Sequence, residues 1–468
     1  MSSTRSIIAL AALTLCDCAM IPRYERPPAP VAARFPRATE PSSGASVAAP
    51  VWKEFYQEPR LLRLVELALA SNRDLRVAVL NVQKSRAAYH VTRSNSFPAV
   101  DANGSFIREH VTGTAIAPGT PSYAEFTGNE WTAQVGTSAY ELDLFGRVRS
   151  LNRQALEQYF ATTEARRAAQ ISLVAEVATQ YFALREAQEQ LELARQTLQA
   201  VQESYDLNKA SFDAGQVNEL DLRTAEGQVQ TAMTNIATYE RQLAQADNAL
   251  VLLVGQPLPA DLPAPRPFDA PHVLADVPAG LPSDLVERRP DILEAEHTLK
   301  AANANIGAAR AAFFPTVSLT GSIGSASPGL SRLFDSGTGQ WSFSPQISLP
   351  IFAGGKNLAN LQVAKLSTRI EVANYEKAIQ TAFREVADAL IAHSTYATEV
   401  QVETAAIDTQ QRRLELATAR YRQGEDSYLN VLLAQQDLYG VQQSRLQAQF
   451  NSLSSRISLY QALGGGWK

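Results

Sequence analysis

Apolar residues recur at every seventh position along two long stretches of the chain, and this spacing predicts coiled-coil helices. Residues 147–214 form 68 positions without a glycine or a proline, and residues 356–423 form another 68. As one helix, each stretch would be roughly 100 Å long. A repeat of seven keeps one seam of a long helix facing a partner. The two seams consist of Val177, Leu184, Leu191, Leu198, Tyr205 and Phe212, and of Val372, Ile379, Val386, His393, Val400, Ile407, Leu414 and Tyr421.

Each long stretch ends at a glycine and is followed by a shorter helical stretch without proline. Gly215 precedes residues 216–254, and Gly424 precedes residues 425–463. A shift of 209 positions places Leu220 on Leu429 and extends the match through both seams. A shift of 217 places residues 74–104 on 291–321. The chain is therefore a tandem duplication, in which each half contains a helix, two strands and a long helical hairpin.

Period-two alternation predicts the two strand pairs, at 100–111 with 131–144 and at 316–324 with 341–352. Apolar residues alternate there with small polar ones, as in a transmembrane barrel strand. A half-buried soluble hairpin has the same alternation, so the strands alone do not decide between the two. Four strands are too few to close a membrane barrel, and open strand edges are excluded from hydrocarbon. If the chain spans a membrane, it must therefore oligomerise.

The rest of the chain divides at its prolines and apolar runs. The predicted segments are a lipoprotein signal peptide (1–17), an extended arm (18–57), a first repeat (58–255), a proline-rich connector (256–283), a second repeat (284–463) and a tail (464–468). The first repeat is expected to open with one helix from Glu58 or Pro59 to Arg93, and the second with a helix that starts at Ser283. After the N-terminus, no stretch approaches the 18 uninterrupted apolar residues of a spanning helix.

Charge and motifs argue against two classes of function, nucleic-acid binding and catalysis. The formal net charge is -5 and no basic run is present, which argues against nucleic acid as a partner. No glycine-rich phosphate loop or nucleophile elbow occurs, so we expect neither an enzyme nor a cofactor. His393 lies in the second seam, and we interpret it as a packing residue that the seam tolerates and not as a sensor. The other histidines, His90, His110, His272 and His297, lack metal-ligand spacing.

The only two cysteines lie directly after an apolar run, Ile7 to Leu15, that follows Arg5. This layout is typical of a secretory signal, and a cysteine at its end favours a lipoprotein signal. Cys18 is preferred over Cys16 as the acylated residue, although Asp17 departs from the small residue that normally precedes it. The alternative is a plain cleaved signal that removes both thiols. In either case the mature body has no disulfide and no thiolate metal site.

The duplicated layout, the two glycine turns and the residues 428–432 that follow the second turn resemble the outer membrane factor family. These TolC-like proteins are the exit ducts of tripartite efflux and type I secretion systems. Residues 18–27 and 463–468 look like its lipoprotein branch, which serves resistance-nodulation-division drug pumps. The resemblance implies a mainly α fold, with coiled-coil hairpins that form an α-barrel. It also implies a homotrimer in the outer membrane, whose chains each give four strands to one 12-stranded β-barrel.

The resemblance further implies a passive duct that is closed at its periplasmic tips and opened by a periplasmic adaptor protein. Asp221, Tyr428 and Leu429 match aperture positions, while Gly215, Gln216, Gly424, Glu425 and Asp426 match the adaptor-docking tips. A solvated carboxylate or simple coiled-coil packing would also explain the aperture residues. Leu433 and Asn430 stand where relatives carry an acidic ring, so cation binding is not carried over. A type I secretion duct and a coiled-coil scaffold without a pore remain the alternatives.

Overall fold

The computed structural model describes residues 19–32, 34–35, 51–111, 126–274 and 288–465. The chain divides into two compact units. Unit 1 comprises residues 1–27, 82–162 and 295–374, and unit 2 comprises residues 28–81, 163–294 and 375–468. The predicted signal peptide and Cys18 lie outside the described residues, as do the end of the connector and the last three residues.

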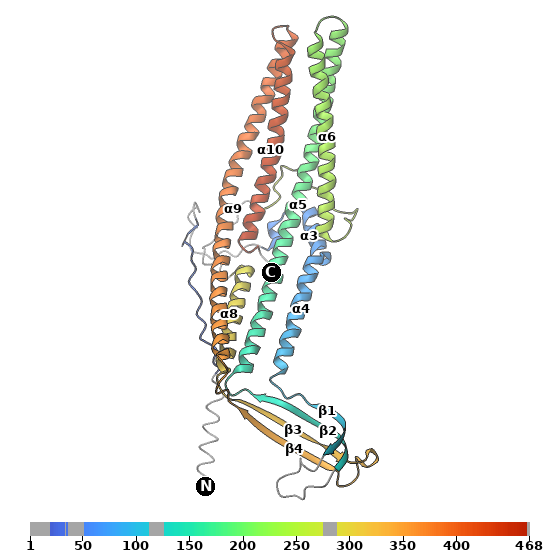
Figure 1. The fold of residues 1–468 in the computed structure, drawn as a ribbon. Helices are drawn as coiled ribbons and strands as arrows, with labels where there is room; N and C mark the ends of the chain where they lie inside the picture. The colour runs from blue at the N-terminus through green and yellow to red at the C-terminus, as the bar shows by residue number, and fades with distance from the viewer. Residues whose placement is uncertain (1–18, 33, 36–50, 112–125, 275–287, 466–468) are drawn as a thin grey trace. The chain divides into compact units, whose positions relative to one another are not determined.

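The fold is mainly helical, as the sequence predicted, with one small sheet (Figure 1). Two helices are exceptionally long, and each is 67 residues without interruption. Both begin in unit 1 and end in unit 2. The α-helices are α2 (Trp52–Phe55), α3 (Pro59–Ser71), α4 (Arg73–Ser94), α5 (Arg147–Asp213), α6 (Glu219–Val254), α8 (Pro290–Ala311), α9 (Lys356–Arg422) and α10 (Tyr428–Ala462).

The helix expected from Glu58 to Arg93 is in fact two helices, because Asn72 interrupts it. Asn72 has an extended backbone with ψ of 135°. Its side-chain oxygen accepts a hydrogen bond from the Leu75 amide at 2.8 Å, which caps the start of α4. Its side-chain nitrogen donates to the Leu253 carbonyl at 2.8 Å. The asparagine therefore ends one helix, starts the next and fixes both to the end of α6.

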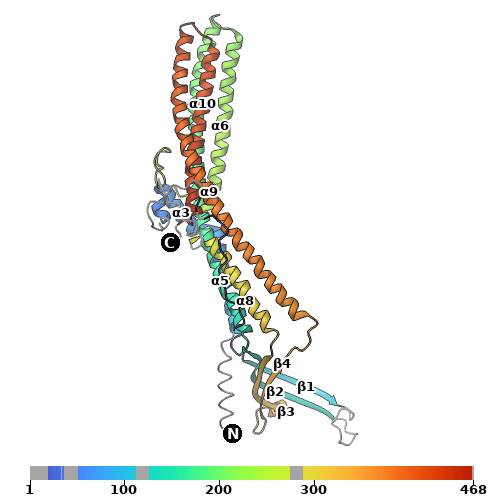
Figure 2. The same cartoon turned by 90° about the vertical axis from the view of Figure 1, so that its left-hand side faces the viewer.

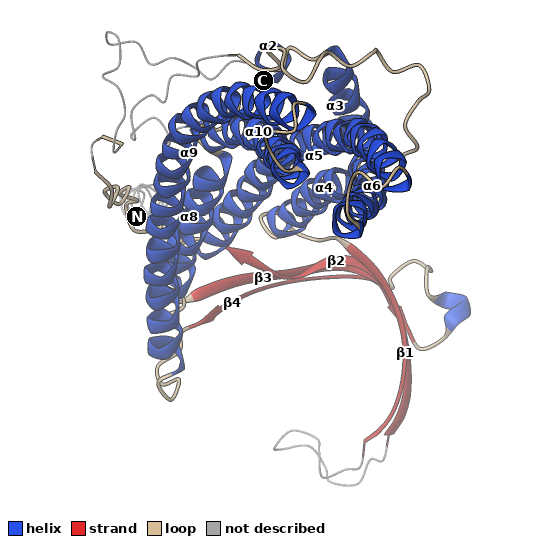
Figure 3. Ribbon diagram, turned by 90° about the horizontal axis from the view of Figure 1, so that it is seen from above, coloured by secondary structure: helices blue, strands red, loops and turns tan. Residues whose placement is uncertain are grey.

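The four strands form one antiparallel sheet in unit 1, in the order β1-β2-β3-β4 (Figure 3). The strands are β1 (Asp101–Val111), β2 (Phe126–Leu142), β3 (Thr316–Ser327) and β4 (Gly339–Ser348). β2 starts five residues before the predicted position, and β4 ends at Ser348, close to Pro350, which cannot donate a ladder hydrogen bond. Pairing of β2 with β3 joins the two repeats in one sheet.

A bulge in β2 explains why its apolar alternation shifts by one residue near its end. The register against β3 breaks between Thr137 and Tyr140. Ala139, at this break, has a positive φ of 53°, and its amide donates to the Thr320 hydroxyl at 3.1 Å. A bulge inserts an extra residue and so exchanges the two faces of the strand beyond it. Leu142 consequently pairs with Val317 on β3.

One face of the sheet carries rows of apolar side chains that cross all four strands. Residues directly opposite one another in antiparallel strands share a face. The clearest row consists of Ala102, Val135, Ile323 and Trp341. In the isolated chain, Ile323 is 69% exposed and Trp341 is 76% exposed. Such a large apolar surface indicates contact with a non-aqueous environment or a partner.

The core of unit 2 forms where helices of both repeats meet the connector. Phe55 stacks on Tyr460 of α10 with ring centroids 4.1 Å apart. Tyr56 pairs with Val273 of the connector in an antiparallel bridge, and Phe182 of α5 is fully buried in the same cluster. Burial of each such aromatic side chain contributes about 1.5–3 kcal/mol. The seam residues Val177 and Val386 are also fully buried, whereas Phe212 near the tip is 36% exposed.

Candidate functional site: the hairpin tips

Both long hairpins reverse direction through the same backbone motif (Figure 2). Gly215 and Gly424 each have a φ of 74°. At the first tip, the Gln216 amide donates to the Ser211 carbonyl and the Gly215 amide to the Phe212 carbonyl, both at 2.8 Å. The second tip has the equivalent pair, at 3.0 and 2.9 Å. This is the Schellman motif, in which glycine is favoured because L side chains resist a positive φ.

The helices that leave the two tips start in different ways. Asn218 caps α6, because its side-chain oxygen accepts the Asp221 amide at 2.9 Å. At the second tip, Asp426 accepts from the Ser427 amide and from the Asn430 side chain. The Asn430 and Ser427 hydrogen bonds, with Arg420 nearby, lower the pKa of Asp426. Asp426 therefore organises the second tip, and its half-buried carboxylate is less available than that of Glu425.

Four helices meet directly behind the tips in a small apolar cluster, which we call the tip cluster. Its buried members are Ala225 of α6 and Tyr428, Val431 and Leu432 of α10, and it is flanked by Tyr205, Leu414, Ala417 and Tyr421. Tyr428 is only 4% exposed, and its ring lies 5.3 Å from that of Tyr421. The tip cluster thus packs side chains of both hairpins against one another.

A hydrogen bond adds to this packing, and two of the predicted aperture residues, Asp221 and Tyr428, interact electrostatically. The Tyr428 hydroxyl is hydrogen bonded to Ser204 of α5. Burial raises the pKa of Tyr428 and that of Tyr421, and the nearby Asp221 carboxylate raises both further. The charge of Asp221 therefore acts on the tyrosine pair, although Asp221 belongs to the other hairpin. Asp221 is also the third residue of α6, and its backbone amide donates to the capping Asn218 side chain.

The remaining predicted site residues lie on the surface of the isolated chain. Leu429 is 52% exposed and does not join the tip cluster, unlike its neighbour Tyr428. Gly215, Gln216, Gly424 and Glu425 are exposed at the ends of the hairpins. A Cβ atom added at either glycine would meet nothing within 4 Å. The tip glycines are therefore needed for their conformation and not for close packing.

Three features of the tips were not predicted from the sequence. Ser204 lies 224 residues from its partner Tyr428, and Asn208 donates to the Ser204 carbonyl one turn away. An open groove of about 590 Å³ runs between α9 and α10 and is lined by Arg412, Arg413 and Arg420 among others. The shift of 209 places Glu203, Ser204 and Ser211 at these arginine positions, so the three arginines of the groove have no counterparts in the first hairpin. A comparison of the two repeats in the sequence could therefore have identified the arginines of this groove.

The described residues contain no group of three or more His, Cys, Asp or Glu side chains that could hold a metal ion. No helix among them is both long enough and apolar enough to cross a bilayer.

Comparison with known proteins gives matches over nearly the whole chain. The family model described as outer membrane efflux protein matches residues 64–256 and 281–465. The toluene efflux pump outer membrane protein TtgC of Pseudomonas putida is 46% identical over 470 residues, which cover 99% of this chain and 96% of that protein. The solvent efflux pump outer membrane protein SrpC of Pseudomonas putida is 47% identical over 472 residues, with coverages of 99% and 98%. The crystal structure of the open state of the Neisseria gonorrhoeae MtrE outer membrane channel matches with a TM-score of 0.87 and 40% identity, and covers 96% of this chain and 99% of that one.

Proposed function

The chain belongs to the outer membrane efflux protein family, and on that premise we propose that it is the passive exit duct of a tripartite pump. It is a channel of the outer membrane that extends into the periplasm. Small molecules expelled by a resistance-nodulation-division pump of the inner membrane would reach it through a periplasmic adaptor protein. The duct itself does no chemistry. The observation that carries the proposal is the alignment of 99% of the chain with efflux pump outer membrane proteins.

The open sheet supports a trimeric assembly. β1 and β4 are its two edge strands, and an unpaired edge cannot lie in hydrocarbon. Three copies that pair β1 of one chain with β4 of the next would close a barrel of 12 strands, which is within the range of outer membrane barrels. The apolar rows that contain Ile323 and Trp341 would then face lipid.

The tips support a closed aperture that opens when the adaptor docks. The docking surface would consist of the exposed turn residues Gly215, Gln216, Gly424 and Glu425, together with the half-buried Asp426. Asp221, Tyr428 and Leu429 would hold the aperture shut, with Tyr428 tied to Ser204 within the chain and Leu429 directed to a neighbouring copy. Opening is a shift between two packed arrangements, so the adaptor must bind the open one more tightly.

The substrates are proposed to be small apolar compounds, among them aromatic solvents and antibiotics. The names of two relatives specify toluene and solvent efflux. We expect deletion of the gene to raise intracellular accumulation of toluene and of a fluorescent pump substrate, because the inner membrane pump then has no exit across the outer membrane. The measurement is accumulation in energised cells, with and without a plasmid that restores the chain.

A complemented strain that carries Glu425→Ala and Asp426→Ala separates docking from conduction. We expect this variant to reach the outer membrane and to restore little efflux. Equal accumulation in the wild-type and deletion strains would contradict the duct, and full efflux by the tip variant would place docking elsewhere.

We also propose that Cys18 carries the lipid anchor, and the contacts of the segment that follows support it. The Met20 carbonyl accepts from Arg310 at the end of α8 at 3.2 Å. Arg26 makes two hydrogen bonds, at 3.0 and 2.9 Å, to the 3% exposed carboxylate of Glu296. These contacts fix residues 20–26 along α8, which leads within five residues into β3.

Mass spectrometry of the mature N-terminal peptide is expected to show a diacylglyceryl and acyl modification on Cys18. Cys18→Ser is expected to abolish it, and the control Cys16→Ser to leave it unchanged, because residue 16 is removed with the signal. An unmodified mature N-terminus, or a modification that is lost only in Cys16→Ser, would overturn this assignment.

A further inference from the structure

The two repeats of the chain contact each other through α5 of the first repeat and α8 of the second. Nδ1 of His297 in α8 lies 2.6 Å from Oε2 of Glu157 in α5, and the His297 ring lies 5.4 Å from that of Phe160. Nearer to the strands, Gly307 is so close to Ser150 that an added Cβ atom would lie 2.5 Å from the Ser150 Oγ. α5 and α8 therefore form a junction between the repeats inside one chain.

A stripe of four positions on α5 is buried and includes this junction. The positions follow one another at spacings of seven, four and three residues, which places them on one face of the helix. All four side chains are buried, although three of them are polar. The stripe consists of Ser150, Glu157, Ala161 and Glu164.

The equivalent stripe on α9 is exposed and entirely apolar. A shift of 209 gives its members, which are Ala359, Leu366, Ile370 and Ala373. All four are exposed in the single chain, with Leu366 at 47% and Ile370 at 59%. An apolar stripe along one face of a helix is typical of a face that packs against another element. The α9 stripe thus lacks the cover that its counterpart on α5 has.

α4 is the counterpart of α8 and exposes apolar side chains at the matching positions. The shift of 217 places Leu80 at the position of His297, and Val91 at that of Ala308. Leu80 is 51% exposed and Val91 is 70% exposed, whereas Ala308 is buried. Leu80 and Leu366 therefore occupy the positions that a contacting histidine and glutamate occupy inside the chain.

The strands of the sheet follow the same order. β2 pairs with β3 where the first repeat meets the second. Trp131 of β2 lies opposite Phe106, and Trp341 of β4 lies opposite Ile323, which is 217 residues after Phe106. β4 is therefore the counterpart of β2, and β1 is the counterpart of β3. The two edge strands are thus the counterparts of the two strands that join the repeats.

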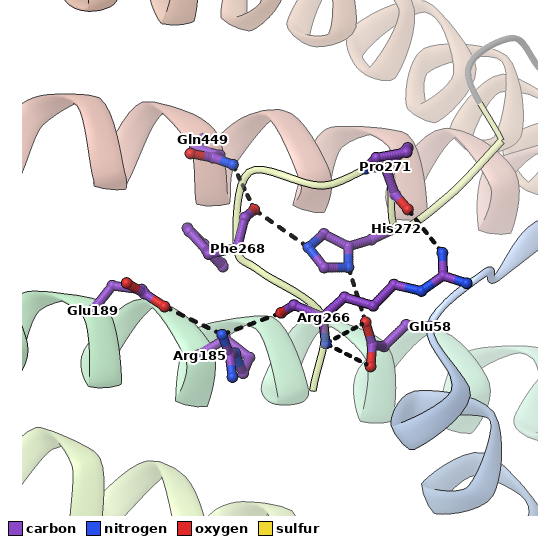
Figure 4. A network of polar contacts seen from close by, with 8 residues as sticks. All are labelled: Glu58, Arg185, Glu189, Arg266, Phe268, Pro271, His272 and Gln449. Atoms are coloured by element: carbon purple, nitrogen blue, oxygen red, sulfur yellow. Dashed lines mark hydrogen bonds and ion pairs between the residues drawn. The ribbon is translucent and has the colours of Figure 1, made fainter. Parts of the chain in front are cut away.

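Polar contacts of the connector also fasten the repeats to each other (Figure 4). Arg185 of α5 and Gln449 of α10 donate to carbonyl groups of the connector, at 3.4 and 2.5 Å. Nδ1 of His272 in the connector lies 3.1 Å from Oε2 of Glu58. The shift of 209 places Ser394 at the position of Arg185, so α9 lacks the long donor that α5 offers to the connector. Other contacts must therefore cover α9.

We propose that neighbouring copies of the chain meet as the two repeats meet, so that α9 of one copy packs on α4 of the next, with Leu366 against Leu80. The two exposed stripes lie on the counterparts of helices that already contact each other, which identifies the occupant as a second copy of this chain. Such a head-to-tail interface closes into a ring when the rotation between copies permits it. This interface rests on the trimeric duct proposed above and specifies the residues that join its copies.

Chemical cross-linking of the full-length protein in outer membranes tests this interface. The variant is Leu80→Cys with Leu366→Cys, treated with a short bismaleimide. A spacer suits the pair because its counterparts touch through the ends of their side chains, whereas a disulfide requires close Cβ atoms. We expect most of the chain to appear on denaturing gels as covalent dimers and trimers. Each single variant should remain monomeric on the same gel.

A second pair keeps the test decisive if the first variant does not fold. His90→Cys with Ala359→Cys corresponds to the close approach of Gly307 and Ser150. The same bismaleimide is expected to link this pair between copies. Because the two pairs lie two turns apart on α9, linking of both also fixes the antiparallel direction of the two helices.

The matched control pairs Leu80→Cys with Asn360→Cys. Asn360 is exposed on α9, but it is six residues from Leu366 and therefore lies on another side of the helix. No covalent trimer is expected from this variant. A native trimer that neither cysteine pair links, or a control that links equally well, would overturn the interface and leave the duct intact. A monomer before treatment would contradict the trimer itself, and the interface with it.

Discussion

Cells that carry the double variant Asp221→Ala, Leu429→Ala are expected to admit large antibiotics that the wild-type protein excludes. The Asp221 carboxylate acts on Tyr421 and Tyr428, because its charge raises the pKa of both. Leu429 is 52% exposed in the single chain and is free to contact a neighbouring copy. The two substitutions therefore weaken the contacts between hairpins and those between chains. Because the closed arrangement is favoured by only a few kcal/mol in such switches, loss of both is expected to populate the open one.

The measurement is susceptibility to a large antibiotic, such as vancomycin, in a strain that lacks the inner membrane pump. Absence of the pump ensures that the readout reports leak and not efflux. The matched control is Asp213→Ala, Leu220→Ala, which changes two exposed residues of the first tip, and Leu220 is the repeat counterpart of Leu429. Sensitivity equal to the wild type, with the double variant present in the outer membrane, would remove Asp221 and Leu429 from the aperture.

Arg289→Ala is expected to lower the free energy of unfolding by about 3 kcal/mol, the lower end of the cost of breaking a buried ion pair. Arg289 is 8% exposed and lies 2.7 Å from both Asp291 and Glu385. It also donates to the Ala462 carbonyl at 2.9 Å. One guanidinium thus joins the start of α8 to α9 and to the end of α10. The side chains of Asp291 and Glu385 are 39% and 40% exposed, so water can solvate both carboxylates in the variant. The loss of unfolding free energy should therefore stay at this lower end.

Thermal and urea midpoints of the detergent-solubilised protein measure this effect. Arg412→Ala is the control, because Arg412 is 69% exposed and its pair with Glu415 should contribute less than about 1 kcal/mol. Equal midpoints for the two arginine variants would show that the Arg289 contacts add nothing to stability.

The long helices could be predicted from the sequence because a glycine follows the end of each. α5 and α9 end within a residue of the predicted positions, since Gly215 and Gly424 provide the positive φ that ends each helix. The break at Asn72 could not be predicted, because asparagine is tolerated within a helix and the apolar pattern continues through it. The actual start of β2 at Phe126 could not be predicted either, because no apolar alternation marks its first residues.

The contacts of the tips and of the connector depend on residues that are far apart in the sequence. Tyr428 and Ser204 are 224 residues apart, and His272 and Glu58 are 214 apart. From spacing alone, His272 was one of several histidines without a ligand pattern. The fold brings it to Glu58 because residues 266–274 pack against the start of the first repeat, a placement that the composition of a proline-rich segment does not encode. The family resemblance predicted that Asp221 and Tyr428 are aperture residues, but it did not predict the hydrogen bond between Ser204 and Tyr428.

The oligomeric mass of the protein, extracted from the outer membrane fraction in mild detergent, shows whether several chains build one shared barrel. A duct requires that the four-stranded sheets of several chains close on one another, since a single sheet leaves two open edges. We expect a trimer of about 150 kDa in the outer membrane fraction, three times the 50.9 kDa chain. A monomer, or a protein that does not sediment with membranes, would contradict it and would favour a coiled-coil scaffold without a pore.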